Sequence, residues 1–155
     1  MKLVDQRIFI DAAPVEVYAL LIDAERLVEW MAPVVYADPT PGGVLTWTHV
    51  NGDRVVGAFL ELQPHRRIVF SFGWDREDVE IPPGSTTVEI DLRPRDGGTD
   101  LHLVHRGLAE TMADAHQGGW TNYLARLAAV AEGRDPGPDP LAGERVPAAR
   151  AIGQS

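Results

Sequence analysis

Four tryptophans are the residues in this sequence best suited to bind a ligand: Trp30, Trp47, Trp74 and Trp120. Each occupies a position that strand alternation or helical spacing directs inward. An indole combines a large apolar surface with one N–H donor, so converging indoles can line a pocket for a flat or apolar molecule and bind its polar end. Aromatic side chains on facing elements fill a core equally well, so the pattern alone leaves both a pocket and a filled core open.

Histidine spacing predicts no metal site. His102 and His105 have the form of a chelating pair, but residues three apart on a strand point to opposite faces of the sheet. His105 is expected on the inward face, where it either donates a hydrogen bond to a ligand or is satisfied by neighbours within the sheet. The remaining histidines are scattered and form no convergent ligand set.

Acid–base chemistry has few candidates. His105, Tyr123 and Glu61 are the titratable groups at inward or ambiguous positions, and the acidic residues of the loop at 75–85 are most simply solvated. The chain has no cysteine, which excludes a thiol nucleophile, a thiolate zinc site and disulfides. Serine-hydrolase elbows, phosphate loops and dinucleotide fingerprints are also missing from the sequence. We therefore expect no catalytic residue, no metal and no cofactor, and binding rather than catalysis.

The length, net charge and apolar runs of the chain limit its domain organisation and the classes of partner it can bind. A chain of 155 residues fits one domain. The net charge of −9 disfavours nucleic acid, and no apolar run is long enough to span a membrane. The amino terminus has no signal-peptide core, so a cytoplasmic location is expected. A monomer and a homodimer are both compatible with the sequence.

Alternation and turn signals predict the elements that position these residues. A strand at 3–11 precedes a helix that begins at Pro14 and a short helix at 24–31 capped by Asp23. Asn51-Gly52 predicts a two-residue hairpin turn, and Asp96-Gly97-Gly98 another turn. Phe59 lies on a strand whose alternation is ambiguous. The expected later strands are 44–50, 54–62, 66–74, 86–94 and 99–107.

A long helix is predicted from about 113 to 132, with Gly133 as its carboxyl-terminal cap. Gly118-Gly119 either lies inside this helix, shaping a close backbone approach, or marks a helix that begins later, near Trp120. Residues 134–155 are rich in Pro, Gly and Ala and predict a flexible tail. The fold class is α+β, with a curved antiparallel sheet of about six strands covered by the long helix.

Several segments, taken in order, resemble the START-like (SRPBCC) superfamily, which has the helix-grip or Bet v 1-like fold. The similarity is closest to the group related to the activator of the heat-shock-protein-90 ATPase. It runs from about residue 3 to 133, so we expect one START-like domain at 1–133. The matching segments are IDAAPVEVYALLIDAERLVEWM, PGGVLTW, NGDRVVGAFLELQPHRRIVFSF, STTVEIDLRPRDGGTDLHLVHRGL and HQGGWTNYLARLAAVAEG.

The resemblance implies a cavity between the sheet and the long helix that binds a small hydrophobic, aromatic or lipid molecule. The superfamily also contains cyclases and many uncharacterised bacterial proteins. One alternative is therefore a polyketide cyclase or aromatase in which His105 or Tyr123 points into the cavity. Another is a protein-interaction module like the chaperone ATPase activators. By matched position, the expected cavity walls are Trp30, Trp47, Phe59, Phe70, Phe72, Trp74, His105, Trp120, Tyr123, Leu124 and Leu127.

Overall fold

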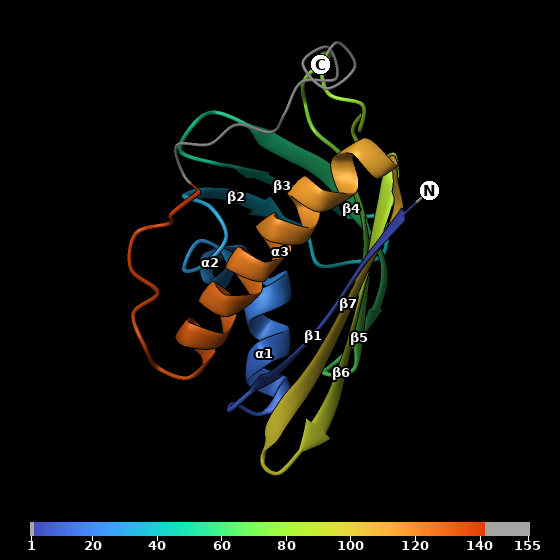
Figure 1. The fold of residues 1–155 in the computed structure, drawn as a ribbon. Coiled ribbons are helices and arrows are strands. Elements are labelled where there is room, and N and C mark those ends of the chain that lie inside the picture. The colour runs from blue at the N-terminus through green and yellow to red at the C-terminus, as the bar shows by residue number, and fades with distance from the viewer. Residues whose placement is uncertain (1, 142–155) are drawn as a thin grey trace.

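A curved antiparallel sheet and one long helix dominate the computed structural model, which describes residues 2–141 (Figure 1). The strands are β1 (Lys2–Ile10), β2 (Val34–Ala37), β3 (Val44–Thr48), β4 (Arg54–Gln63), β5 (Arg67–Phe72), β6 (Thr86–Arg95) and β7 (Gly98–Leu108). The helices are α1 (Pro14–Ile22), α2 (Ala24–Leu27) and α3 (Glu110–Ala131). The order of elements agrees with the α+β helix-grip expectation.

The sheet has seven strands rather than about six, in the order β1-β7-β6-β5-β4-β3-β2. The additional strand is β2, which forms the edge beside β3. Its four residues are partly exposed, with Val34 at 62% and Tyr36 at 63% of their surface. A four-residue edge strand whose inward residues, Val35 and Ala37, are only partly buried carries little alternation signal, which explains why the sequence did not predict it.

Strand β4 contains a bulge that explains its ambiguous alternation. Phe59 pairs with Phe70, but the next paired residue on β4 is Glu61, opposite Val69. Leu60 is thus the extra residue, and 52% of its surface is exposed. Because a bulge reverses the alternation of the strand, Phe59 on one side of it and Leu62 on the other both face the core.

The turns differ in part from the prediction. Asp96 and Gly97 have positive φ angles of 50° and 80°, as a two-residue hairpin turn with the twist of the sheet requires. Asn51-Gly52, however, lies in a five-residue loop at 49–53 rather than a two-residue turn. There the Asn51 side-chain oxygen accepts from the Asp53 amide at 2.8 Å, which closes the longer loop.

The long helix α3 crosses the sheet on its concave side (Figure 1). It begins at Glu110, so Gly118 and Gly119 lie inside it and the alternative of a later start near Trp120 is wrong. Gly133 follows its end with a φ of 79°, as predicted for the cap. The other end of the interior is filled by α1 and by α2, which is shorter than predicted because the chain turns after Leu27.

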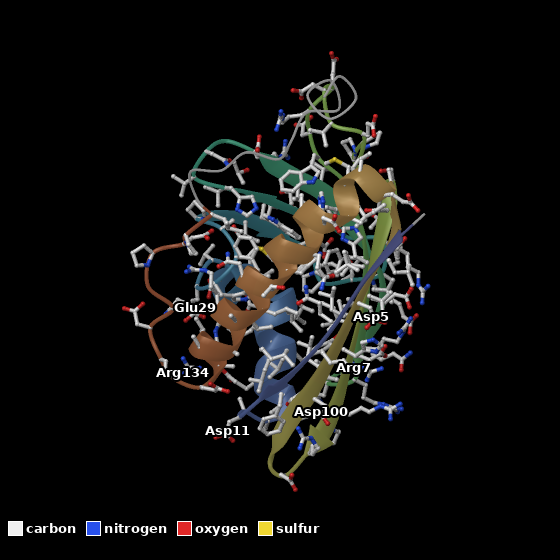
Figure 2. All side chains as sticks on the ribbon, viewed as in Figure 1. Asp5, Arg7, Asp11, Glu29, Asp100 and Arg134 are labelled. Carbon is white, nitrogen blue, oxygen red and sulfur yellow. The ribbon has the colours of Figure 1, made fainter. Side chains whose placement is uncertain are left out.

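The end of β1 meets the end of α3. The Asp11 amide donates to Glu132 Oε2 at 2.9 Å, and Figure 2 labels Asp11 and the nearby Arg134. After α3 the chain doubles back along the helix as far as residue 141 (Figure 1). The remainder of the predicted flexible tail, residues 142–155, lies outside the described residues. None of the described helices has the length and apolarity needed to cross a bilayer.

Candidate functional site

A cavity of about 570 Å³ lies between the first half of α3 and the strands β3 to β5. Its volume falls within the roughly 300–1,000 Å³ range typical of sites for small molecules. Pro140 and Leu141 of the returning chain lie at its surface. The other lining residues are Met31, Trp47, His49, Asn51, Asp53, Val55, Phe72, Trp74, Asp114, Ala115, His116, Gly118, Gly119, Trp120, Thr121, Asn122 and Tyr123.

Five of the eleven residues predicted to line a cavity do so, namely Trp47, Phe72, Trp74, Trp120 and Tyr123. The other six belong instead to the closely packed interior beside the cavity. Helix α1 adds the buried side chains of Val17, Tyr18, Leu20 and Leu21 to the same core. The six residues that the structure places in the core are Trp30, Phe59, Phe70, His105, Leu124 and Leu127.

Three indoles are each bonded to a histidine. The indole N–H of Trp47 donates to His49 Nε2 at 3.1 Å, and that of Trp74 donates to His116 Nε2 at 3.0 Å. The third pair, Trp120 to His105 Nδ1, has a length of 3.1 Å. We expected these N–H groups to be available to a ligand, but each is occupied inside the protein. What the indole rings offer the cavity is therefore their carbon surface.

His105 lies beneath the cavity floor, with none of its surface exposed. Its Nδ1 accepts from Trp120, so Nε2 carries the proton and donates to Thr86 Oγ1 at 2.8 Å. Thr86 in turn donates to the Phe72 carbonyl at 2.7 Å. Burial, with a smaller contribution from the nearby His116, lowers the pKa of His105 to about 3. His105 is thus a neutral, fully bonded core residue and has no group directed at a ligand.

His116 is also held as a single neutral tautomer. Its Nδ1 lies 2.9 Å from the Met112 carbonyl and must donate the proton, since Nε2 accepts from Trp74. Burial lowers its pKa as well. His116 therefore contributes a hydrophobic, uncharged ring edge to the cavity at neutral pH.

A hydrogen-bonded chain links the cavity wall to the returning segment. The pKa of His49 is lowered by burial, and its Nδ1 lies 3.3 Å from the Tyr123 hydroxyl. Tyr123 donates to Asp139 Oδ2 at 2.5 Å, and Asn122 donates to the other oxygen at 3.1 Å. Burial and this bond raise the pKa of Tyr123. The segment before Pro140 is thereby fixed to α3 at the cavity edge.

Asp53 is a buried carboxylate in the cavity wall, with 1% of its surface exposed. Arg76 Nη1 lies 3.4 Å from both of its oxygens. The same guanidinium bonds to Asp78 at 2.8 and 2.9 Å. The Arg76 guanidinium therefore contacts both carboxylates, one in the cavity wall and one in the adjoining loop.

Two glycines of α3 leave space in the cavity wall. Gly118 and Gly119 line the cavity, and a Cβ added to either would meet no atom within 4 Å. Glycine inside a helix costs roughly 1 kcal/mol relative to alanine, so the pair reduces helix stability while leaving space. Of the two, Gly119 shares the helix face of His116, Trp120 and Tyr123 by its spacing.

Comparison with known proteins assigns the family. The family model described as "Activator of Hsp90 ATPase homolog 1-like protein" matches residues 11–132, most of the chain. The chain belongs to the family of activator of Hsp90 ATPase homolog 1-like proteins. A solved member, the AHSA1-like protein from Rhizobium etli, is 41% identical, with 94% of this chain and 91% of that chain covered and a TM-score of 0.68. No curated protein sequence matches the chain significantly.

Two more distant structures share the fold of this AHSA1-like protein. The Aha1 dimer from Colwellia psychrerythraea is 21% identical, covers 85% of this chain and 97% of its own, and has a TM-score of 0.73. DynU16, a putative protein in the dynemicin biosynthetic locus, is 20% identical and has a TM-score of 0.75. There the similarity covers 90% of this chain and 51% of DynU16. At these identities the likeness concerns the fold alone.

Within the described part of this AHSA1-like chain, no group of three His, Cys, Asp or Glu residues is arranged to hold a metal. His102 bonds to Asp5 at 2.8 Å on the outer face, opposite His105, as their odd spacing predicted. The site instead combines aromatic walls, neutral histidines and carboxylates. Such a site can enclose a flat molecule, and it has no activated nucleophile within the described residues.

Sequence reasoning did not predict several cavity residues of this AHSA1-like protein. His116 lies four residues before Trp120 and so shares its helix face, and His49 follows Trp47 on one strand face. These spacings were the available signal for both histidines. Asp53 and Leu141 gave no such signal, because the 49–53 loop and the returning segment bring them to the cavity.

Proposed function

We propose that this protein binds a small apolar or aromatic molecule in the cavity between α3 and β3–β5. The observation that carries the proposal is the cavity of about 570 Å³ with ring surfaces on both sides. Trp47, Phe72 and Trp74 come from the sheet, and Trp120 and Tyr123 come from the helix. A flat ligand placed between two layers of rings removes apolar surface from water on both of its faces, which favours binding.

The glycines on α3 support the same proposal. A packed interior would be better stabilised by alanine or a larger residue at position 119, because glycine lowers helix stability. Gly119 instead leaves open space on the helix face that also carries His116, Trp120 and Tyr123. Gly119 therefore lowers the stability of α3 at the position where a larger side chain would occupy the volume proposed for the ligand.

Titration with N-phenyl-naphthylamine, an uncharged dye that fluoresces in apolar surroundings, tests the proposal. We expect saturable binding with one dye per chain. Gly119→Leu places a side chain in the cavity and should weaken binding by about tenfold or more, because the dye then competes with that volume. Ala125→Leu is the matched control, since it adds a similar side chain at an exposed position of the same helix.

Dye binding that is equally strong in Gly119→Leu and Ala125→Leu would contradict the proposal, because the dye would then bind elsewhere. Circular dichroism and thermal unfolding of both variants establish that each is folded. Since an added Cβ at residue 119 meets no atom within 4 Å, Gly119→Leu is expected to fold normally.

A cyclase-like enzyme is the second candidate, and Tyr123 is the observation that favours it. Of the two residues considered for proton transfer, Tyr123 lines the cavity and His105 does not. A hydroxyl bonded to Asp139 and close to His49 has a path for its proton. Its raised pKa, however, favours the neutral phenol, so Tyr123 would act as a donor rather than a base. Unchanged turnover of a cyclisable substrate by Tyr123→Phe would exclude this role.

A further inference from the structure

The chain doubles back after α3 and passes the cavity as a strap, defined here as residues 134–141. Figure 1 shows the strap running beside α3 from the end of the helix toward β2. Its last two residues, Pro140 and Leu141, line the cavity. Leu141 is half-buried there, while Pro138 and Pro140 are exposed. The strap thus forms one boundary of the cavity and has solvent on its other side.

Proline at every second position makes the strap stiff. Pro136, Pro138 and Pro140 each have a restricted φ angle and no backbone N–H, so this stretch can neither continue α3 nor form a full strand ladder. Proline-rich segments are extended and semi-rigid. Gly133 and Gly137, with φ angles of 79° and 71°, provide the conformations that favour glycine. Rotation about Gly137 would therefore move residues 138–141 together.

Asp139 attaches the half of the strap at the cavity to α3. One oxygen of its carboxylate accepts from the Tyr123 hydroxyl at 2.5 Å, and the other accepts from the Asn122 amide at 3.1 Å. The second oxygen also accepts from the backbone N–H of Leu141 at 2.8 Å. The carboxylate that holds the strap on the helix therefore also fixes the turn that brings Leu141 to the cavity.

The strap is the cavity boundary with the weakest attachment. The sheet is held by a continuous ladder of paired strands, and α3 is anchored by buried side chains such as Trp120 and Leu124. Beyond Arg134, by contrast, the strap bonds to α3 through the side chains of Arg126 and Asp139. Segments with few buried apolar contacts and partly exposed hydrogen bonds open at a lower free energy than the core. The strap should therefore open before the sheet or the helix does.

Resting on the proposed function, we propose that the strap is a gate for the cavity and that the Asp139 carboxylate holds it closed. A ligand enters and leaves after Asp139 separates from Tyr123 and Asn122, while Arg126 keeps the first half of the strap on α3. Because entry and exit require the same opening, the hydrogen bonds of Asp139 limit both rate constants. They affect the affinity less, since a larger open population speeds entry and exit together.

Stopped-flow fluorescence with N-phenyl-naphthylamine measures both rate constants. Asp139→Ala should raise the association and the dissociation rate constants about tenfold each, a factor that the loss of a hydrogen bond to a charged group allows. The equilibrium dissociation constant should change by less than about threefold. Asp11→Ala is the matched control, because it removes an exposed carboxylate beside the opposite end of α3 and should leave both rate constants unchanged.

Locking the strap provides a second test, in which the gate is held shut. Asn122 and Asp139 face each other at 3.1 Å, and the chain has no cysteine, so Asn122→Cys/Asp139→Cys introduces one isolated pair of thiols. A short bis-methanethiosulfonate reagent bridges the two thiols through disulfides, and dithiothreitol removes the bridge. The bridged protein should take up and release the dye at least about tenfold more slowly than the same protein after reduction.

The outcomes separate the gate from the proposed function. Unchanged rate constants in Asp139→Ala, or a bridged protein that exchanges dye as fast as the reduced one, would overturn the gate and leave the binding cavity in place. Faster dissociation without faster association would also overturn it, because the strap would then be only a wall that contacts the ligand. Equal acceleration in Asp11→Ala would contradict the role given to Asp139. A wild type that binds no dye would contradict both proposals.

Discussion

Trp120 and His105 face each other across the helix–sheet interface, and the indole N–H donates to Nδ1 at 3.1 Å. This bond determines which nitrogen of His105 carries a proton and directs that proton to Thr86. It also ties α3 to β7 at the floor of the cavity. The polar atoms of the floor are satisfied among themselves, and the ring surfaces remain for a ligand.

The buried histidines predict a pH dependence of stability. The pKa of His105 is lowered to about 3, and those of His49 and His116 are lowered as well. The unfolded chain takes up these protons near pH 6.5, whereas the folded protein takes them up only at lower pH. The free energy of unfolding should therefore fall as pH decreases from about 6.5 to 4.5, by up to about 1.4 kcal/mol per pH unit for each histidine.

Urea unfolding at a series of pH values measures this slope. His116→Gln keeps an acceptor for Trp74 and removes one titrating group, so its slope should be smaller than that of the wild type. A free energy of unfolding that stays constant through this interval would show that the histidines titrate alike in both states. That result would contradict the burial described for them.

Thr86 should be a sensitive position in the core. Its hydroxyl bonds to both His105 and the Phe72 carbonyl, and 4% of its surface is exposed. Thr86→Val leaves a buried imidazole N–H without a partner and should cost about 1–3 kcal/mol of stability. Thr87→Val is the matched control on the opposite, partly exposed face of β6, where thermal unfolding should change little. Equal losses in the two variants would argue against the Thr86 bonds.

Gly118→Ala should stabilise the protein. A Cβ at this position meets no atom within 4 Å, and the residue lies inside α3. Alanine restricts the unfolded chain and favours the helix, so the expected gain is up to about 1 kcal/mol. Denaturant unfolding provides the measurement. A loss of stability would mean that the helix requires glycine there for a reason other than open space.

Asp139 should hold the returning segment on α3. Asp139→Ala removes the acceptor of Tyr123 and Asn122, while Arg126 still donates to the Gly137 carbonyl at 2.9 Å. The backbone amides of residues 139 and 141, the two positions of this segment that are not proline, should then exchange hydrogen faster, with little change in the sheet. In the same variant the pKa of Tyr123 should fall but stay raised, because burial is its larger cause. Unchanged exchange would show that Asp139 does not hold the segment.

Much of the fold followed from alternation and helical spacing, and the remainder depended on contacts between distant segments. Val88, Ile90 and Leu103 are buried as their strands predicted. The bulge at Leu60 reverses alternation at one residue, which a periodic pattern cannot reveal. Strand β2 is four residues long and its inward residues, Val35 and Ala37, are only partly buried, so its alternation signal is weak.

The site could be predicted only in part, for a physical reason. Strand and helix periodicity identify which residues point inward, but they do not show where the interior is left unfilled. Leu124 and Phe70 point inward and are packed, whereas Trp74 borders open space. The bond from Trp74 to His116 joins residues 42 positions apart, so no local pattern encodes it.

The indole N–H signals of the four tryptophans in a heteronuclear NMR spectrum test the central claim most directly. Trp30 is an internal control, because its N–H donates to the Leu20 carbonyl within the core. On titration with N-phenyl-naphthylamine we predict saturable shifts of the Trp47, Trp74 and Trp120 signals and little change in that of Trp30. Absence of any saturable shift, or equal shifts of all four signals, would contradict an aromatic binding cavity between α3 and the sheet.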